Sequence, residues 1–319
     1  MESYAAVVVT YNRSNLLGIC LDALSRQTRP LDAIVIIDNA SSDDTEAVVT
    51  SFAASTILNV FYRKLESNLG GAGGFAFGTR LAHELGYSGI WLMDDDGVPA
   101  DDALEQLLMI DGPAIRNSLV VDIDNPALLA FPLEHVPGAK TVADAQSLGT
   151  IANNSANPFN GTLVSSYVFD AVGFPFDGFF IWGDEVEFLN RVKAHGYAIC
   201  TVTGALHRHP ANRKQPYLLF DRYQVNVVDR SRLFVYMRNY SYNLFYYKGL
   251  RTWLSFMIKQ LSYEVFIQRS AGRVMTAIEA ATNGLFGFAT KVKQGAKTDY
   301  RPAVATTIDW TDRHGAIAV

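Results

Sequence analysis

The sequence predicts an α/β fold, in which a mainly parallel sheet is flanked by helices and followed by a helical C-terminal extension. Strand-sized apolar runs begin at Ala5, Ala33, Val60 and Gly89, and amphipathic segments separate them. Strands that alternate with helices in this way form right-handed βαβ units and parallel sheets. Hydrophobic residues make up 49% of the 319 residues and charged residues 18%, so the chain can build a sizeable core.

The elements are predicted in the following order. Strands are expected at Ala5–Val9, Ala33–Ile37, Val60–Lys64 and Gly89–Met93, with helices at Asn15–Ser25, Ser42–Phe52 and Gly73–Gly86. The stretch from about 111 to 155 has scattered prolines and is predicted as loop. A strand at Asn160–Phe169, a helix at Asp184–His195 and a last strand at Ile199–His207 complete a catalytic domain over residues 1–230, whose halves meet near residue 110. Two or three aromatic-rich helices are expected in the extension, residues 231–319.

Charge is distributed unevenly between these two parts. The segment from Arg238 to Lys297 holds nine basic and two acidic residues, a net charge of +7, whereas the whole chain carries −5. A basic, aromatic-rich segment suits an anionic membrane surface or a diphosphate-linked acceptor. Packing on the core, or an oligomer interface, explains the segment equally well. Nucleic acid is not expected as a partner.

Cysteine content and hydropathy favour a cytoplasmic protein. Cys20 and Cys200 alone do not make a disulfide framework, so reduced thiols are expected. The first residues lack the basic start of a secretion signal, and no run of apolar residues is long enough for a membrane span.

Three adjacent carboxylates, Asp94, Asp95 and Asp96, follow the fourth predicted strand. Ligands of such sheets bind at the carboxyl ends of the strands, where Thr10, Tyr11 and Asp38 are also expected. Adjacent carboxylates repel one another, and a hard cation such as Mg²⁺ or Mn²⁺ relieves that repulsion while bridging to phosphate oxygens. An isolated triplet is more often a solvated acidic turn, but its place after a buried strand favours the cation site.

Three further motifs carry candidate chemistry. The glycine cluster at 68–74 (NLGGAGG) leads into a helix, where backbone amides can approach a phosphate; close helix packing explains it about as well. The acids of the 183–187 segment (GDEVE) follow Trp182 and serve either as helix caps or as a general base. His207 and His209 lie on one side of a strand, so that either can complete a metal site. The carboxylate of Asp38 either accepts a hydrogen bond from the base N–H of a pyrimidine or caps a turn.

Together these motifs resemble the family 2 glycosyltransferases of the GT-A fold, and more closely the bacterial galactofuranosyltransferases. The resemblance rests on segments 7–13 (VVVTYNR), 37–41 (IDNAS), 68–76 (NLGGAGGFA), 91–97 (WLMDDDG), 130–133 (AFPL), 159–161 (FNG), 183–187 (GDEVE) and 206–210 (LHRHP). It covers roughly residues 4–245. The mycobacterial enzymes that start galactan are especially similar.

The resemblance implies a donor of UDP-galactofuranose, inversion at the anomeric carbon and a donor half at about 1–110. Thr10, Tyr11 and Asp38 would surround the uridine, with Gly70 and Gly71 near the donor. Asp94 and Asp96 would meet the metal and diphosphate, and Asp95 the ribose or sugar. His209 is favoured as the third metal ligand, with His207 as the alternative.

The acceptor half, at about 111–230, would hold the chemistry of proton removal. Glu185 is expected to be the base, with Asp184 and Trp182 binding the acceptor; because relatives commonly carry Asp at the base position, Asp184 remains the alternative. The acceptor is expected to be a glycan on a polyprenyl diphosphate, met at the cytoplasmic face of the membrane. Other donors (rhamnose, galactose), a sugar-phosphate nucleotidyltransferase and a degenerate, non-catalytic subunit are the competing hypotheses.

Overall fold

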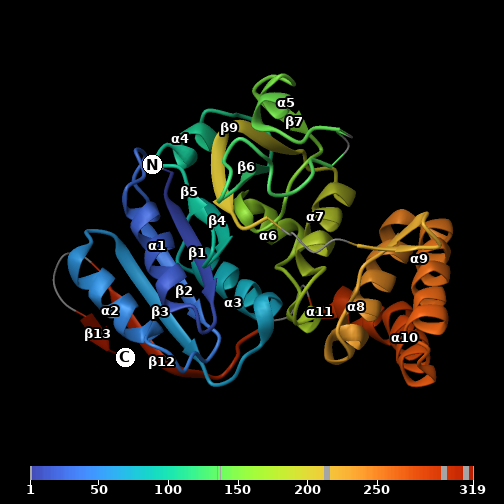
Figure 1. The fold of residues 1–319 in the computed structure, drawn as a ribbon. Helices are drawn as coiled ribbons and strands as arrows, with labels where there is room; N and C mark the ends of the chain where they lie inside the picture. The colour runs from blue at the N-terminus through green and yellow to red at the C-terminus, as the bar shows by residue number, and fades with distance from the viewer. Residues whose placement is uncertain are drawn as a thin grey trace.

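A mixed sheet of eleven strands organises the computed structural model, which describes residues 2–134, 136, 138–211, 216–295, 300–311 and 316–318 (Figure 1). Its first half contains β1 (Tyr4–Thr10), α1 (Ser14–Ser25), β2 (Ala33–Asp38), α2 (Thr45–Ser55), β3 (Asn59–Leu65), α3 (Gly70–Glu84), β4 (Gly89–Asp94), β5 (Val98–Pro99) and α4 (Ala103–Leu108). The order β3-β2-β1-β4 is parallel throughout, as predicted. Thr10 pairs with Asp38 and Val9 with Asp94, so these strands end level at one edge.

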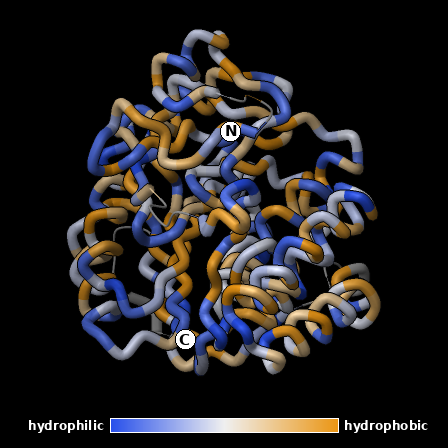
Figure 2. Tube along the Cα trace, turned by 45° about the vertical axis from the view of Figure 1, so that its right-hand side comes forward, coloured by the Kyte–Doolittle hydropathy of each residue, from blue (hydrophilic) through white to orange (hydrophobic). Residues whose placement is uncertain are grey.

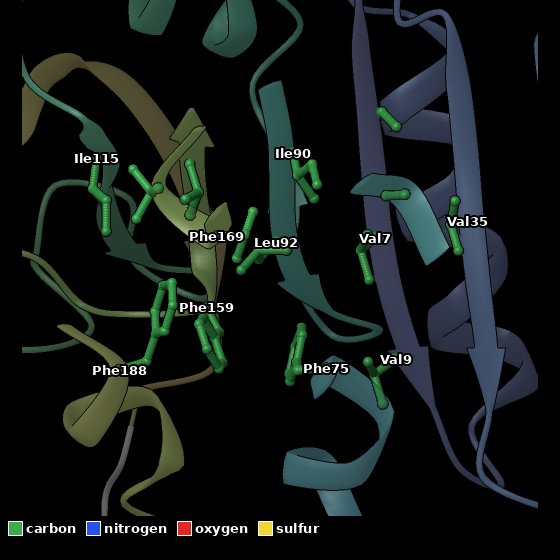
Figure 3. Close-up of a cluster of buried hydrophobic side chains, with 14 of the residues drawn as sticks. Val7, Val9, Val35, Phe75, Ile90, Leu92, Ile115, Phe159, Phe169 and Phe188 are labelled. Atoms are coloured by element: carbon green, nitrogen blue, oxygen red, sulfur yellow. The ribbon is translucent and has the colours of Figure 1, made fainter. Parts of the chain in front are cut away.

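The strands are buried on both faces, and alternate residues feed two separate cores. On β1, Val7 and Val9 pack with Phe75 of α3 and with residues of α6 and α7 (Figure 3). Val8 of the same strand packs on the other face, against α1, α2 and α4, together with Leu21. Because both faces are covered, the strands read as continuous apolar runs without polar alternation.

The second half of the catalytic domain differs from the prediction. It contains β6 (Ile115–Asp122), α5 (Val142–Gln146), β7 (Ile151–Asn153), β8 (Asn160–Ser165), α6 (Tyr167–Val172), the 3-10 turn η1 (Asp177–Phe179), α7 (Asp184–Ala194), β9 (Ile199–His209) and the hairpin β10 (Tyr217–Leu219) and β11 (Tyr223–Val225). The stretch predicted as loop thus includes β6, which pairs with β9 inside the sheet. The predicted strand at 160–169 ends at Ser165 and gives way to α6. β8 runs antiparallel to both β4 and β6.

The extension forms three helical rods and then returns to the sheet. Each of the first two rods ends in a π-helical turn: α8 (Arg230–Asn243) with η2 (Leu244–Lys248), and α9 (Leu250–Ser262) with η3 (Tyr263–Ile267). The third comprises α10 (Ala271–Asn283), η4 (Gly284–Phe288) and α11 (Ala289–Gly295). Hydrophobic segments occur both in the interior and on these helices (Figure 2). Among the described residues, every helix is too short or too polar to cross a bilayer.

A strand that the sequence did not predict closes the edge of the sheet. β12 (Val304–Trp310) pairs antiparallel with β3 and carries the short β13 (Ala316–Ala318) on its outer side. Arg63 of β3 makes an ion pair with Asp309 of β12. The end of the extension therefore belongs to the sheet of the first half.

Candidate active site

A cavity of about 590 Å³ opens at the carboxyl ends of β1 and β4. It lies between the sheet edge, the start of α3 and the segment that precedes α7. Most of the residues predicted from the sequence line it: Thr10, Tyr11, Gly70, Gly71, Asp94, Asp95, Asp96, Trp182, Asp184, Glu185 and His209. A cavity of this volume suits a small molecule of the size of a nucleotide sugar.

Asp95, the middle carboxylate of the triplet, is bound by the protein itself. The hydroxyl of Thr10 donates to it at 2.7 Å, and Arg13 donates to it at 3.1 Å. Arg13 also donates to Asp96 at 2.8 Å. Arg13 therefore bridges two of the three carboxylates. It belongs to the motif that predicted Thr10 and Tyr11, but the sequence assigned it no role.

Asp94 and Asp96 form, with His209, a group that can hold a metal ion. One ligand atom of each lies within 4.8 Å of the others. Burial and the charges of Asp96 and Asp95 raise the pKa of Asp94 to about 7. Such a carboxyl is costly to ionise without a cation, and two carboxylates with one imidazole are a donor set that Mn²⁺ or Mg²⁺ accepts. The residues therefore fit a divalent cation.

The hydrogen bonds of His209 orient its ring for that role. Nε2 lies 3.1 Å from Asp96, and Nδ1 lies 2.8 Å from the carbonyl oxygen of Pro210, which can only accept. Nδ1 therefore carries a proton, and Nε2 faces the carboxylates. Although burial opposes both shifts, this contact raises the pKa of His209 and lowers that of Asp96.

His207 is placed differently from His209. It is buried on the same strand, and a side chain at Gly97 would strike its Nε2. Burial lowers its pKa to about 3. His207 thus packs beneath the turn of the acidic triplet, outside the metal-binding group found among the described residues.

Asp38 reaches the expected sheet edge but does not line the cavity. Its two oxygens accept from the backbone N–H of Ser41 at 2.7 Å and from the hydroxyl of Tyr62 at 2.6 Å. The side chain is buried, and these contacts hold the turn after β2. Tyr11, by contrast, lines the cavity and is 44% exposed.

The glycine cluster packs closely, which is one of the two purposes that the sequence left open, and the approach of a phosphate stays a prediction. At Gly74 an added Cβ would strike Val9, so close helix packing requires glycine there. Gly70 has a φ of +71°, and a Cβ on it would collide with the carbonyl oxygen of Phe180. Gly70 and Gly71 begin α3 at the cavity. The N–H of Gly70 donates to the side chain of Asn68 at 2.8 Å, so the N–H of Gly71 is the one that can face an anion at this helix start.

The segment from Gly178 to Gly183, called the 178–183 loop below, is bent by unusual backbone angles. Phe180 and Trp182 have φ values of 66° and 63°, which non-glycine residues rarely adopt. From the other side of the loop, buried Asn239 of α8 donates to the carbonyl oxygens of Phe179 at 3.0 Å, Ile181 at 2.9 Å and Trp182 at 2.7 Å.

Two further side chains of α8 hold the same loop. Asn243 donates to the carbonyl oxygen of Gly183 at 3.0 Å, and Arg238 donates to that of Gly178 at 2.9 Å. Arg232 lies 5.7 Å from the ring of Trp182 and lines the cavity. The periodic pattern that predicted a helix here contains no signal for these contacts.

The acids after the 178–183 loop have separate environments. Asp184 is buried, and burial followed by the charge of Glu185 raises its pKa well above the usual value. Glu185 is half-buried in the cavity wall, and its side chain accepts from the backbone N–H of Gly183 at 2.8 Å. Glu187 is buried away from the cavity lining, where it accepts from Arg191 at 2.9 Å and Tyr247 at 3.0 Å. Glu187 is thus a structural residue.

The sheet is covered by helices on both faces, and the carboxylates at its strand ends face an acidic helix start across one cavity. This arrangement defines a glycosyltransferase of the GT-A fold. Comparison with known structures agrees. TarS of S. aureus has a TM-score of 0.57 at 13% identity, over 89% of this chain and 81% of that one. GalNAc-T7, solved with UDP, GalNAc and Mn²⁺, has a TM-score of 0.58 at 12% identity, over 93% and 58%.

Sequence comparison narrows the class. A family model described as glycosyl transferase family 2 matches residues 5–110. Galactofuranosyltransferase GlfT1 of Mycolicibacterium smegmatis is 35% identical over 219 residues, which are 66% of this chain and 71% of that protein. GlfT1 of Mycobacterium tuberculosis is 36% identical over 218 residues, 66% and 70% of the two chains. The chain therefore belongs to the GlfT1-like galactofuranosyltransferases of glycosyl transferase family 2.

Proposed function

We propose that this enzyme transfers galactofuranose from UDP-galactofuranose to a hydroxyl group of a glycan acceptor, with inversion at the anomeric carbon. The observation that carries the proposal is that one cavity is lined by the metal-binding group and by Glu185 and Trp182. The similarity to GlfT1 supports galactofuranose as the sugar. Rhamnose and galactose remain the alternative donors.

On the donor side, the chain holds the nucleotide at the ends of β1 and β4. Thr10 and Tyr11 would contact the uridine, and Gly70 and Gly71 would lie near the donor, with the N–H of Gly71 toward the diphosphate. Asp94, Asp96 and His209 would hold Mn²⁺ or Mg²⁺, which when bound neutralises the charge that develops on the departing diphosphate. Asp95, held by Thr10 and Arg13, would face the ribose or sugar. Asp38 supports this edge from within.

On the acceptor side, Glu185 is the proposed base. Its carboxylate takes the proton of the acceptor hydroxyl, whose oxygen attacks the anomeric carbon from the face opposite UDP. The bond between that carbon and the diphosphate oxygen breaks, and its electron pair leaves with UDP. Asp184, whose raised pKa favours a protonated carboxyl, can donate a hydrogen bond to the acceptor, and Trp182 offers an aromatic platform.

We further propose that the acceptor is a lipid-linked glycan, met at the cytoplasmic face of a membrane. The net charge of +7 between Arg238 and Lys297 supports an anionic partner for the extension. Arg232, at the acceptor end of the cavity, adds a cation there. Cys20 and Cys200 are free and buried, which agrees with a reducing compartment.

The proposal is tested by UDP release from UDP-galactofuranose in the presence of a rhamnose-terminated acceptor, with Mn²⁺ and with EDTA. We expect release with Mn²⁺ and none with EDTA, and Asp94→Asn should behave as the EDTA sample does. A panel of nucleotide sugars read by mass spectrometry identifies the donor. Transfer of rhamnose or galactose in place of galactofuranose would overturn the donor assignment.

A further inference from the structure

The outer face of the extension exposes an apolar stripe along α9. Leu250, Leu254 and Ile258 repeat every fourth residue, and their exposed fractions are 54%, 42% and 65%. Residues with this spacing lie on one face of a helix. In η3 the chain continues with Phe266, which is 58% exposed and lies against the ring of Phe220, at 5.9 Å between centroids.

A second apolar stripe runs along the third rod. Met275 and Ile278 of α10 are 71% and 49% exposed, and Phe286 of η4 is 71% exposed. Figure 1 shows α9 and α10 at the outer end of the extension, farthest from β3 and β12. The two helices thus present large apolar side chains on the part of the molecule that projects from the catalytic sheet.

Basic side chains accompany these stripes. Arg251 and Arg269 are exposed, and Lys259 is half-buried. Of the two acids in the segment, Glu264 is buried and paired with Arg273, which leaves Glu279 as the exposed one. We call this surface, made by the two apolar stripes and these basic residues, the outer face.

We propose that the outer face docks on an anionic lipid surface, with the apolar stripes in the interfacial region and the basic side chains at the headgroups. Helices that carry apolar residues beside lysine and arginine bind membranes in this way, and each basic residue adds to the attraction. A second copy of the chain would bind the outer face less well than a lipid surface does, because two outer faces of the same positive charge would repel each other. The acidic remainder of the molecule would face away from the lipid.

A second cavity, of about 610 Å³, lies beside this face. This cavity is lined by Tyr236, Tyr240 and three residues of α9, which are Arg251, Ser255 and Lys259. Each of the three follows a member of the α9 apolar stripe by one position. A headgroup phosphate at this level of the membrane would meet two cations and two tyrosine rings.

The same cavity lies directly behind the acceptor side of the active site. The ring of Tyr236 packs on that of Trp182, at 6.3 Å between centroids, and the charge of Glu185 contributes to the raised pKa of Tyr240. Docking by the outer face therefore brings the acceptor end of the active site to the membrane, whichever sugar the enzyme transfers.

Vesicle sedimentation tests the proposal with the full chain. Vesicles of phosphatidylglycerol and phosphatidylcholine should bind the protein, and vesicles of phosphatidylcholine alone should bind it at least about tenfold more weakly. The double variant Leu254→Glu, Ile258→Glu should lose binding, whereas Ile57→Glu should keep it. Ile57 is a matched control, because it is 76% exposed and follows α2 in the catalytic domain.

A second double variant tests the charges. Arg251→Glu with Arg269→Glu should weaken binding to anionic vesicles by about tenfold or more and reduce its dependence on salt. Neither of these pairs touches the active-site cavity, so transfer to a short water-soluble acceptor should stay at the wild-type rate. That rate also shows that the variants fold.

Binding of the Leu254→Glu, Ile258→Glu protein at the wild-type level would overturn the proposal. So would an absence of wild-type binding to anionic vesicles at low salt. Sedimentation velocity gives the oligomeric state of each protein. If the same substitutions dissociate an oligomer that does not bind vesicles, the outer face belongs to a second copy. Vesicle binding without sugar transfer would refute the proposed function and leave the docking surface intact.

Discussion

Replacing Asn239 by leucine tests whether α8 holds the acceptor side of the active site in shape. The amide nitrogen of Asn239 carries two N–H groups, and three carbonyl oxygens lie within 3.0 Å of it. Since two N–H groups serve three acceptors, one of them is shared between two carbonyl oxygens. Losing two such bonds and leaving buried carbonyls without a donor costs about 2–4 kcal/mol. The positive φ angles of Phe180 and Trp182 cost about 1–3 kcal/mol each, so the loop should relax once it is released.

The loss should appear in the kinetics of the acceptor. If about 2 kcal/mol of loop stabilisation disappears, the competent population falls about 30-fold, and kcat/KM for the acceptor falls with it. UDP affinity should change much less, because Thr10, Tyr11 and the metal-binding group lie on the sheet. Initial rates with the acceptor varied at saturating donor, and equilibrium binding of UDP, separate the two effects.

A matched control accompanies the variant. Asn283, an exposed asparagine of α10, receives the same change to leucine and should keep wild-type kinetics. Wild-type kcat/KM for the acceptor in Asn239→Leu would refute the positioning role, even if the free energy of unfolding fell. An equal fall in UDP affinity and acceptor kcat/KM would show a collapse of the whole cavity instead.

The other predictions concern the base, the metal site and the extension. Glu185→Gln should leave UDP binding intact and lower transfer by about 10²–10⁴-fold, as loss of a general base does; wild-type turnover would make Asp184 the better base. Mn²⁺ binding, measured by electron paramagnetic resonance, should weaken below the pKa of Asp94, about 7, because a proton then competes with the ion, and should level off above it. An affinity that is constant from pH 5 to pH 8 would contradict this assignment. Arg273→Met should lower the free energy of unfolding by about 3–5 kcal/mol, because it leaves the buried carboxylate of Glu264 without its ion-pair partner. A denaturant titration that shows a loss of less than about 1 kcal/mol would indicate that this carboxylate is in contact with water.

The parallel part of the sheet could be predicted because its signal is local. β1, β2 and β4 are buried on both faces, so their apolar runs stand out, and polar residues mark their ends. Parallel pairing makes the ends of these strands coincide, so the sequence alone predicts that Thr10, Asp94 and Asp96 lie together. The same reasoning placed Asp38 correctly at the edge, but it could not show that Tyr62 and Ser41 already use both of its oxygens.

In the second half of the sheet, β8 and β9 were predicted, but β6 was missed because it buries polar side chains. In β6, Asn117 and Ser118 are fully buried, and the hydroxyl of Thr162 on β8 donates to Asn117 at 2.6 Å. Hydrogen bonding between strands replaces apolar burial there, so periodicity carries no signal. β12 was missed for another reason, since its residues are exposed or half-buried and its partner β3 is distant along the chain.

The extension connects two separate parts of the catalytic domain. Its first helix holds the 178–183 loop through Asn239 and Asn243, and this loop in turn touches the start of α3 at Gly70. Its last strand lies on β3, at the edge of the donor half. A chain that leaves the sheet after β9 and returns at β12 thus contacts both the loop beside the cavity and the strand β3. Because α8 also packs against α9 and α10 through one buried cluster, docking of the outer face would be mechanically connected to the loop that carries Trp182.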